Sequence, residues 1–104
     1  MDIQKMMRQA QKMQSDMQAV QQQLEAAEVS ASAGGGMVTA TVTGAKKIKS
    51  IKISPDVVDK DDVEMLEDLV TAAVSEAMDK ADELAKTEMT KVTGGLGGGL
   101  GGLL

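Results

Sequence analysis

The sequence lacks cysteine, histidine and every aromatic residue. Without cysteine and histidine, the chain has no disulfide, no thiolate nucleophile, no imidazole acid or base and none of the usual zinc ligands. Because most enzyme chemistries lose their principal side chain in this way, we predict a protein that is not an enzyme, with no catalytic residue, no cofactor and no metal site.

The missing aromatic residues also limit the hydrophobic core, which must be built from Met, Val, Ile, Leu and Ala. A single domain of this size hides only about two-thirds of its unfolded surface, and aromatic side chains normally supply much of the buried area. We therefore expect burial between two copies and predict a homodimer.

Long hydrophobic runs are absent as well. The first twelve residues already carry Asp2, Lys5, Arg8 and Lys12, so the chain does not open with a secretory signal. No apolar run approaches the roughly 20 residues that a membrane span needs. We predict a cytoplasmic protein with no membrane partner and no small-molecule substrate.

The charge is unevenly distributed along the chain, whose net charge is −5. Residues 1–53 hold seven basic and four acidic residues, whereas residues 54–104 hold four basic and twelve acidic residues. This asymmetry predicts a local basic interaction surface on the N-terminal half of an acidic protein.

The N-terminal segment has the apolar periodicity of a single helix of four heptads. Its apolar positions, at alternating steps of three and four, are Ile3, Met6, Ala10, Met13, Met17, Val20, Leu24 and Ala27. Lys5, Arg8 and Lys12 fall on the opposite face, with Gln4 and Gln9 nearby. Such side chains can donate hydrogen bonds to phosphates. They can equally form an ordinary solvated helix face, and the sequence leaves both explanations open.

Three short strands follow, at residues 29–33, 37–43 and 46–53. Residues 34–36 are glycines and predict a turn between the first two strands. In the third strand, Ile48 is out of step with the later isoleucines, which indicates a β-bulge near Lys49 and Ser50.

The third predicted strand carries four lysines in seven residues, with no acidic residue among them: Lys46, Lys47, Lys49 and Lys52. Lys46, Lys47 and Lys49 are candidate phosphate contacts. Lysines on an edge strand also prevent unwanted strand pairing, and the two explanations remain about equal.

A long second helix is predicted over about residues 61–92. Ser54 and Pro55 begin a short turn before it, and Asp61 with Glu64 has the spacing of a capping pair. Residues 94–104 are only glycine and leucine, which predicts a flexible tail after a single domain of residues 1–93.

The lengths of these elements give the predicted shape. The two helices would measure about 35 and 45 Å, whereas a seven-residue strand spans about 23 Å. Both helices must therefore extend beyond the sheet. We predict an α+β fold in which paired helix ends form two arms in each dimer.

Other motifs fit structural roles better than binding roles. The glycines at residues 34–36 are not followed by the Gly-Lys-Ser/Thr of a phosphate loop. Asp59, Asp61 and Asp62 lack the glycine and the closing glutamate of a calcium loop, so helix capping explains them better. The heptad spacing of the methionines is typical of core packing rather than of a copper(I) site.

Four segments, in this order and spacing, resemble the YbaB/EbfC nucleoid-associated proteins. They are Gln-Ala-Gln-Lys-Met-Gln at residues 9–14, Ala-Gly-Gly-Gly-Met-Val at residues 33–38, Ile-Lys-Ile-Ser-Pro at residues 51–55 and Glu-Met-Leu-Glu-Asp-Leu at residues 64–69. The resemblance extends over nearly the whole chain.

The resemblance implies a tweezer-like homodimer with α-β-β-β-α order and protruding helices, located in the cytoplasm on the nucleoid. It also implies binding to double-stranded DNA and an influence on gene expression. Carried onto this chain, the implied DNA contacts are Lys5, Arg8 and Lys12 with Gln4 and Gln9, and secondly the strand lysines. The alternative hypothesis is a protein-interaction module whose helical arms clasp a protein partner.

Overall fold

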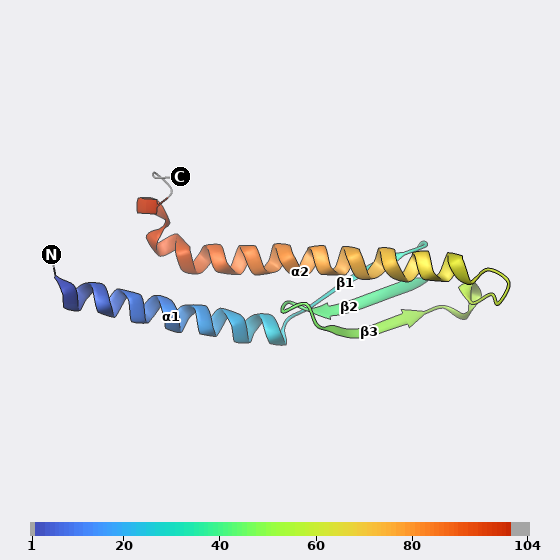
Figure 1. Cartoon of the computed structure of the whole chain (residues 1–104), viewed down its shortest axis with the longest axis horizontal. Helices are drawn as coiled ribbons and strands as arrows, with labels where there is room; N and C mark the ends of the chain where they lie inside the picture. Colours follow the sequence, from blue (N-terminus) through green and yellow to red (C-terminus); the bar gives the residue numbers. More distant parts are fainter. Residues whose placement is uncertain (1, 101–104) are drawn as a thin grey trace.

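Two long helices and a three-stranded sheet make up the computed structural model, which describes residues 2–100 and the side chains of residues 2–93. The chain forms, in order, α1 (Ile3–Ala26), β1 (Glu28–Ala33), β2 (Val38–Thr43), β3 (Ile48–Ile53), the 3-10 turn η1 (Pro55–Val57) and α2 (Val63–Leu100). Figure 1 shows α2 lying along the sheet and then continuing beside α1, in a molecule of 70 × 26 × 16 Å. The α+β class, the order of elements and the overhang of both helices are confirmed.

The sheet is antiparallel, with β2 in the centre and β1 and β3 at its edges. Thr41 lies opposite Ser50 and Val42 lies opposite Ile48, so Lys49 is an extra residue in β3. This is the predicted β-bulge. The strand predicted at residues 46–53 begins later, at Ile48, because the preceding turn includes a lysine with positive φ.

The core lies between α2 and one face of the sheet. Val38 and Val42 of β2 are fully buried, and they are the largest fully buried side chains among the described residues. The facing side chains of α2 include Ala73 and Ala77, also fully buried. Small side chains let the helix approach the sheet closely, and the core is as thin as the composition predicts.

The short turn η1 and the helix α2 are both capped by a side chain, as predicted. The capping residue of α2, however, differs from the one predicted. The Ser54 hydroxyl accepts a hydrogen bond from the Asp56 N–H (3.3 Å) and caps η1, as expected. At α2, however, the Asp62 carboxylate accepts the Met65 N–H (3.2 Å), and it is therefore the cap. The prediction of Asp61 was wrong by one residue, because α2 begins at Val63 and Asp62 therefore stands directly before its first turn.

α2 continues beyond its predicted end. The helix passes through Gly94 and Gly95 and reaches Leu100. Glycine costs a helix about 1 kcal/mol relative to alanine, and residues 94–100 include five glycines, so the predicted end marks where the helix weakens rather than where it stops. Residues 101–104 of the predicted tail lie outside the described residues, and the flexibility of that tail stays a prediction.

The apolar seam of α1 is only partly covered. Val20 and Leu24, near the sheet, are buried, but Ile3 and Met6 are 69% and 52% exposed. The sequence predicts an apolar seam along the whole helix and its pairing with the end of the second helix. Within one chain, however, α1 contacts α2 mainly through its C-terminal half, and its N-terminal half extends past these contacts (Figure 1).

The C-terminal end of α1 is held against the turn between β2 and β3. The Gly44 N–H donates a hydrogen bond to the Ala27 carbonyl oxygen (3.0 Å). A β-carbon added to Gly44 would lie 2.8 Å from the Leu24 carbonyl oxygen. Only glycine permits this close approach, which fixes where α1 leaves the body of the molecule.

Candidate nucleic-acid interface

The N-terminal half of α1 carries a continuous basic surface. Lys5, Arg8 and Lys12 lie within about 60° of the helix circumference, since successive residues are about 100° apart. All three are exposed, and with Gln9 and Asp2 they line a shallow hollow on the helix. The Asp2 carboxylate accepts the Lys5 backbone N–H (3.2 Å) and so caps the helix. We call Lys5, Arg8 and Lys12 the basic stripe.

The positive charges of the basic stripe are not neutralised by acidic neighbours within the described residues. Among residues 2–93, none of its three side chains forms an ion pair. The structure therefore groups four of the five α1 candidates on one surface. Gln4, the fifth, is also exposed but does not line the hollow.

The lysines around β3 are in a different electrostatic situation. Lys46 pairs with Asp82 of α2, and Lys49 lies 2.6 Å from a carboxylate oxygen of Glu28 on β1. Lys47 is exposed and has no ion pair within the described part of the chain. Two of these three candidates are therefore compensated by acids, and none of them lines the hollow on α1.

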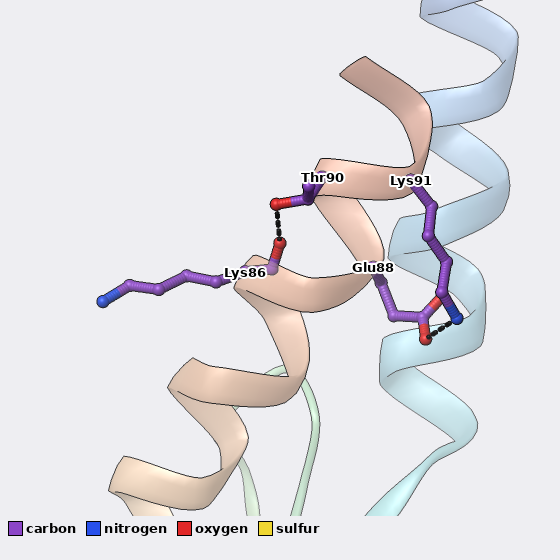
Figure 2. Close-up of polar contacts among 4 residues, drawn as sticks. All are labelled: Lys86, Glu88, Thr90 and Lys91. Atoms are coloured by element: carbon purple, nitrogen blue, oxygen red, sulfur yellow. Dashed lines mark hydrogen bonds and ion pairs between the residues drawn. The ribbon is translucent and has the colours of Figure 1, made fainter. Parts of the chain in front are cut away.

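A second hollow lies between α1 and the end of α2 and has mixed charge. Its lining includes Asp16 of α1 with Glu88 and Lys91 of α2. Figure 2 shows the Lys91 ammonium 3.0 Å from the Glu88 carboxylate, and the Thr90 hydroxyl donating to the Lys86 carbonyl oxygen at 2.7 Å. Because Glu88 compensates Lys91 and Asp16 adds a further negative charge, the end of α2 does not extend the basic stripe.

An apolar stripe on β3 escaped the sequence reasoning. Ile48, Ile51 and Ile53 lie opposite the buried positions of β2, so they share the sheet face that α2 covers. α2 packs mainly on β1 and β2, and the three isoleucines stay exposed by 53%, 38% and 39%. The predicted bulge brings Ile48 into line with the other two, but whether the three are covered depends on where α2 packs, which the strand pattern does not show.

The described residues carry neither a membrane span nor a metal centre. None of their helices is long and apolar enough to cross a membrane. They also contain no cluster of three or more acidic side chains placed to hold a metal ion.

Comparisons with known proteins bear on the chain as a whole rather than on single residues. The model of the YbaB/EbfC DNA-binding family matches residues 1–96. A nucleoid-associated protein of Acetivibrio thermocellus is 59% identical over 97 residues, which cover 93% of this chain and 86% of that protein. Another nucleoid-associated protein, from Saccharopolyspora erythraea, is 54% identical and the match covers 98% of this chain and 90% of that protein.

The fold also has a counterpart among solved structures. An uncharacterised protein of Helicobacter pylori matches with a TM-score of 0.74 at 17% identity, over 84% of this chain and 91% of that chain. Such a distant match bears on the fold alone. The family model and the close relatives nevertheless cover nearly the whole sequence, so the chain belongs to the YbaB/EbfC DNA-binding family and is a nucleoid-associated protein rather than an enzyme.

Proposed function

We propose that this chain acts as a homodimer that binds double-stranded DNA on the nucleoid, mainly through the sugar-phosphate backbone, and thereby influences nucleoid organisation and gene expression. The basic stripe is the observation that carries the proposal. Its three cations are exposed, share one face of a projecting helix and have no ion pair within residues 2–93. They can neutralise phosphates without first breaking a contact inside the protein.

The chemistry of α1 favours backbone contacts over base contacts. The chain has no aromatic side chain to stack on unpaired bases. Lysine, arginine and glutamine donate readily to phosphate oxygens, and such contacts position a protein on DNA without reading its sequence. We therefore expect weak sequence preference, set by the shape of the duplex.

The apolar stripe on β3 supports the homodimer. Ile48, Ile51 and Ile53 continue the buried face of the sheet past the cover of α2, on an edge strand with one side unpaired. Covering them with a second copy buries apolar area and protects the open edge, which otherwise invites aggregation. Each copy then contributes one basic stripe to the dimer.

The salt dependence of binding follows from this arrangement. If the dimer uses both stripes, six phosphates are neutralised, and the slope of log K against log salt is about −5. Affinity then falls by about 10³ between 50 and 200 mM salt.

A charge-reversal experiment tests the proposal. We expect Lys5→Glu/Arg8→Glu/Lys12→Glu to abolish binding of a labelled duplex, because it replaces three phosphate-neutralising cations with anions. The pair Lys60→Glu/Lys86→Glu is the control, since Figure 2 shows Lys86 pointing away from α1. Sedimentation confirms that each variant keeps the oligomeric state of the parent.

The controls make the outcomes distinct. Binding that survives the triple change would show that the basic stripe is not the DNA contact. A wild-type protein that binds no duplex even at low salt, but captures a protein partner in fixed stoichiometry, would favour the protein-interaction module instead.

A further inference from the structure

The face of the sheet opposite to α2 is polar and is not covered by a helix in Figure 1. Side chains alternate along a strand, so Thr39 and Thr41 point away from the buried face that contains Val38 and Ala40. The strand register then assigns their neighbours to the same face. We call this set the hydroxyl face: Ser30 and Ser32 of β1, Thr39 and Thr41 of β2, and Ser50 and Lys52 of β3.

Hydroxyl groups on this face are paired in a way that leaves donors available. Ser30 Oγ lies 2.8 Å from Thr41 Oγ1, and Ser32 Oγ lies 2.8 Å from Thr39 Oγ1. Within each pair one hydroxyl donates to the other, and the accepting hydroxyl keeps its own hydrogen. Both serines are exposed. Each pair can therefore donate one hydrogen bond outward to an anionic oxygen.

The charge on this side of the sheet is favourable for an anion. Lys49 reaches from the bulge to Glu28, whose position opposite Thr43 puts it on the hydroxyl face. Lys52 is exposed and, within the described residues, has no ion pair. α2 carries eight acidic and only three basic residues, and it lies across the opposite face. The acidic residues of α2 are thus kept away from the hydroxyl face, and Glu28, which lies on it, is compensated by Lys49.

We propose that the hydroxyl face is a second contact surface for the phosphodiester backbone of DNA, distinct from the basic stripe. This inference rests on the proposed function. Serine and threonine hydroxyls and lysine are common partners of phosphate oxygens, and the face offers no aromatic ring for a base. A six-residue strand spans about 20 Å, the axial length of about six phosphates of one DNA strand.

The proposed dimer leaves this surface open. Its isoleucine stripe lies on the α2 side of β3, whereas the side chains of the hydroxyl face point to the other side. DNA held at the basic stripe and at the sheet would contact two regions of each protomer. The bound length of duplex would then exceed what the arms alone can hold.

Two variants probe the two chemistries of the face. Lys52→Glu reverses its unpaired charge, and we expect binding to weaken severalfold, with the salt slope reduced by about two units per dimer because each protomer loses one phosphate contact. Ser30→Ala/Ser32→Ala/Thr39→Val/Thr41→Val removes both hydroxyls of each pair, and valine keeps the β-branched shape that suits a strand. We expect it to weaken binding about two- to tenfold without changing the slope.

Matched controls and one assay decide the result. Labelled duplex is titrated at two salt concentrations against the parent chain, the two variants, and the controls Lys60→Glu and Thr71→Val/Thr87→Val. The inference is overturned if the parent binds DNA and both face variants match it in affinity and slope, and the proposed function then stands unaffected. If the parent binds no DNA, the proposed function itself fails and the inference fails with it.

A neutral variant covers the case in which Lys52→Glu aggregates. Lys52→Gln keeps hydrogen-bonding capacity and removes only the charge. A reduced slope for Lys52→Gln supports the phosphate contact. An unchanged slope, together with aggregation of Lys52→Glu, shows instead that the lysine protects the edge of the sheet.

Discussion

Replacing Gly44 with alanine would place a methyl group against the end of α1 that is anchored to the sheet. The new carbon would lie 2.8 Å from the Leu24 carbonyl oxygen and 3.0 Å from the Leu24 Cδ2 atom. To become an ordinary contact, the separation from the carbonyl must grow by about 0.6 Å. Because the carbonyl belongs to the helix backbone, α1 itself has to move.

The arm amplifies this movement. Leu24 is about 6 Å along the helix from Val20, the next buried residue of α1, whereas Gln4 is about 24 Å from Val20 on the other side. If α1 pivots at Val20 so that Leu24 moves by about 0.6 Å, the free end of the helix at Gln4 moves by about 2 Å. We expect a destabilisation of about 1–2 kcal/mol, typical of overpacking, together with a displaced arm.

Spin labels measure the displacement, and the absence of native cysteine makes their placement unique. The distance between spin labels at Gln4→Cys on α1 and Ser75→Cys on α2 reports the angle of α1. Diluting the labelled chain with unlabelled chain ensures that both labels of a measured pair lie in the same chain. Urea denaturation gives the change in stability. Gly35→Ala is the control, because Gly35 has a φ of +66° but no atom within 4 Å of an added carbon, so it should cost stability without moving the labels.

A specific result would refute this reasoning. Where the backbone tolerates alanine and no atom is close, a glycine-to-alanine change usually stabilises a protein by about 0.4–1 kcal/mol. If Gly44→Ala is stabilising and the label distance is unchanged, the anchor of α1 is not tightly packed and its direction has another cause.

Three further changes have expected outcomes. Asp62→Ala removes the cap of α2 and should lower the free energy of unfolding by about 1 kcal/mol in urea, whereas Asp61→Ala should have a smaller effect; equal effects would contradict the assignment of the cap. Ala77→Leu overfills the space between α2 and the sheet and should lower the melting temperature through a loss of about 1–3 kcal/mol, and an unchanged melting temperature would mean a looser core. Ile51→Glu places a charge in the isoleucine stripe and should shift sedimentation from dimer to monomer, so a variant that stays dimeric would locate the interface elsewhere.

Local patterns in the sequence predict most of the fold. The heptads of α1, the three glycines with φ of +64° to +92° and the Ser54-Pro55 turn each depend on neighbours within a few residues, and all occur as expected. The β-bulge at Lys49 is predictable for the same reason, since it follows from the phase of nearby isoleucines.

The features that escaped prediction depend on distant parts of the chain. Lys46 pairs with Asp82, and Lys49 with Glu28, between residues that meet only after the sheet and α2 have packed. The exposure of Ile3 likewise depends on where α2 ends its contact with α1, which periodicity cannot show. The basic stripe was predictable as a helix face, but its lack of ion pairs within residues 2–93 needed the structure.

α2 is a single helix that serves the body and the arm at once. It packs on the sheet through its small buried side chains and continues without a break beside α1. In a dimer, a rotation between the two protomers would therefore move the part of α2 beside α1 together with the part on the sheet. No loop lies between the two parts to absorb the rotation. A rotation of 10° over a lever of 40 Å moves its end by about 7 Å. The spacing of the two arms in such a dimer would then be adjusted at the sheet rather than at the basic stripe.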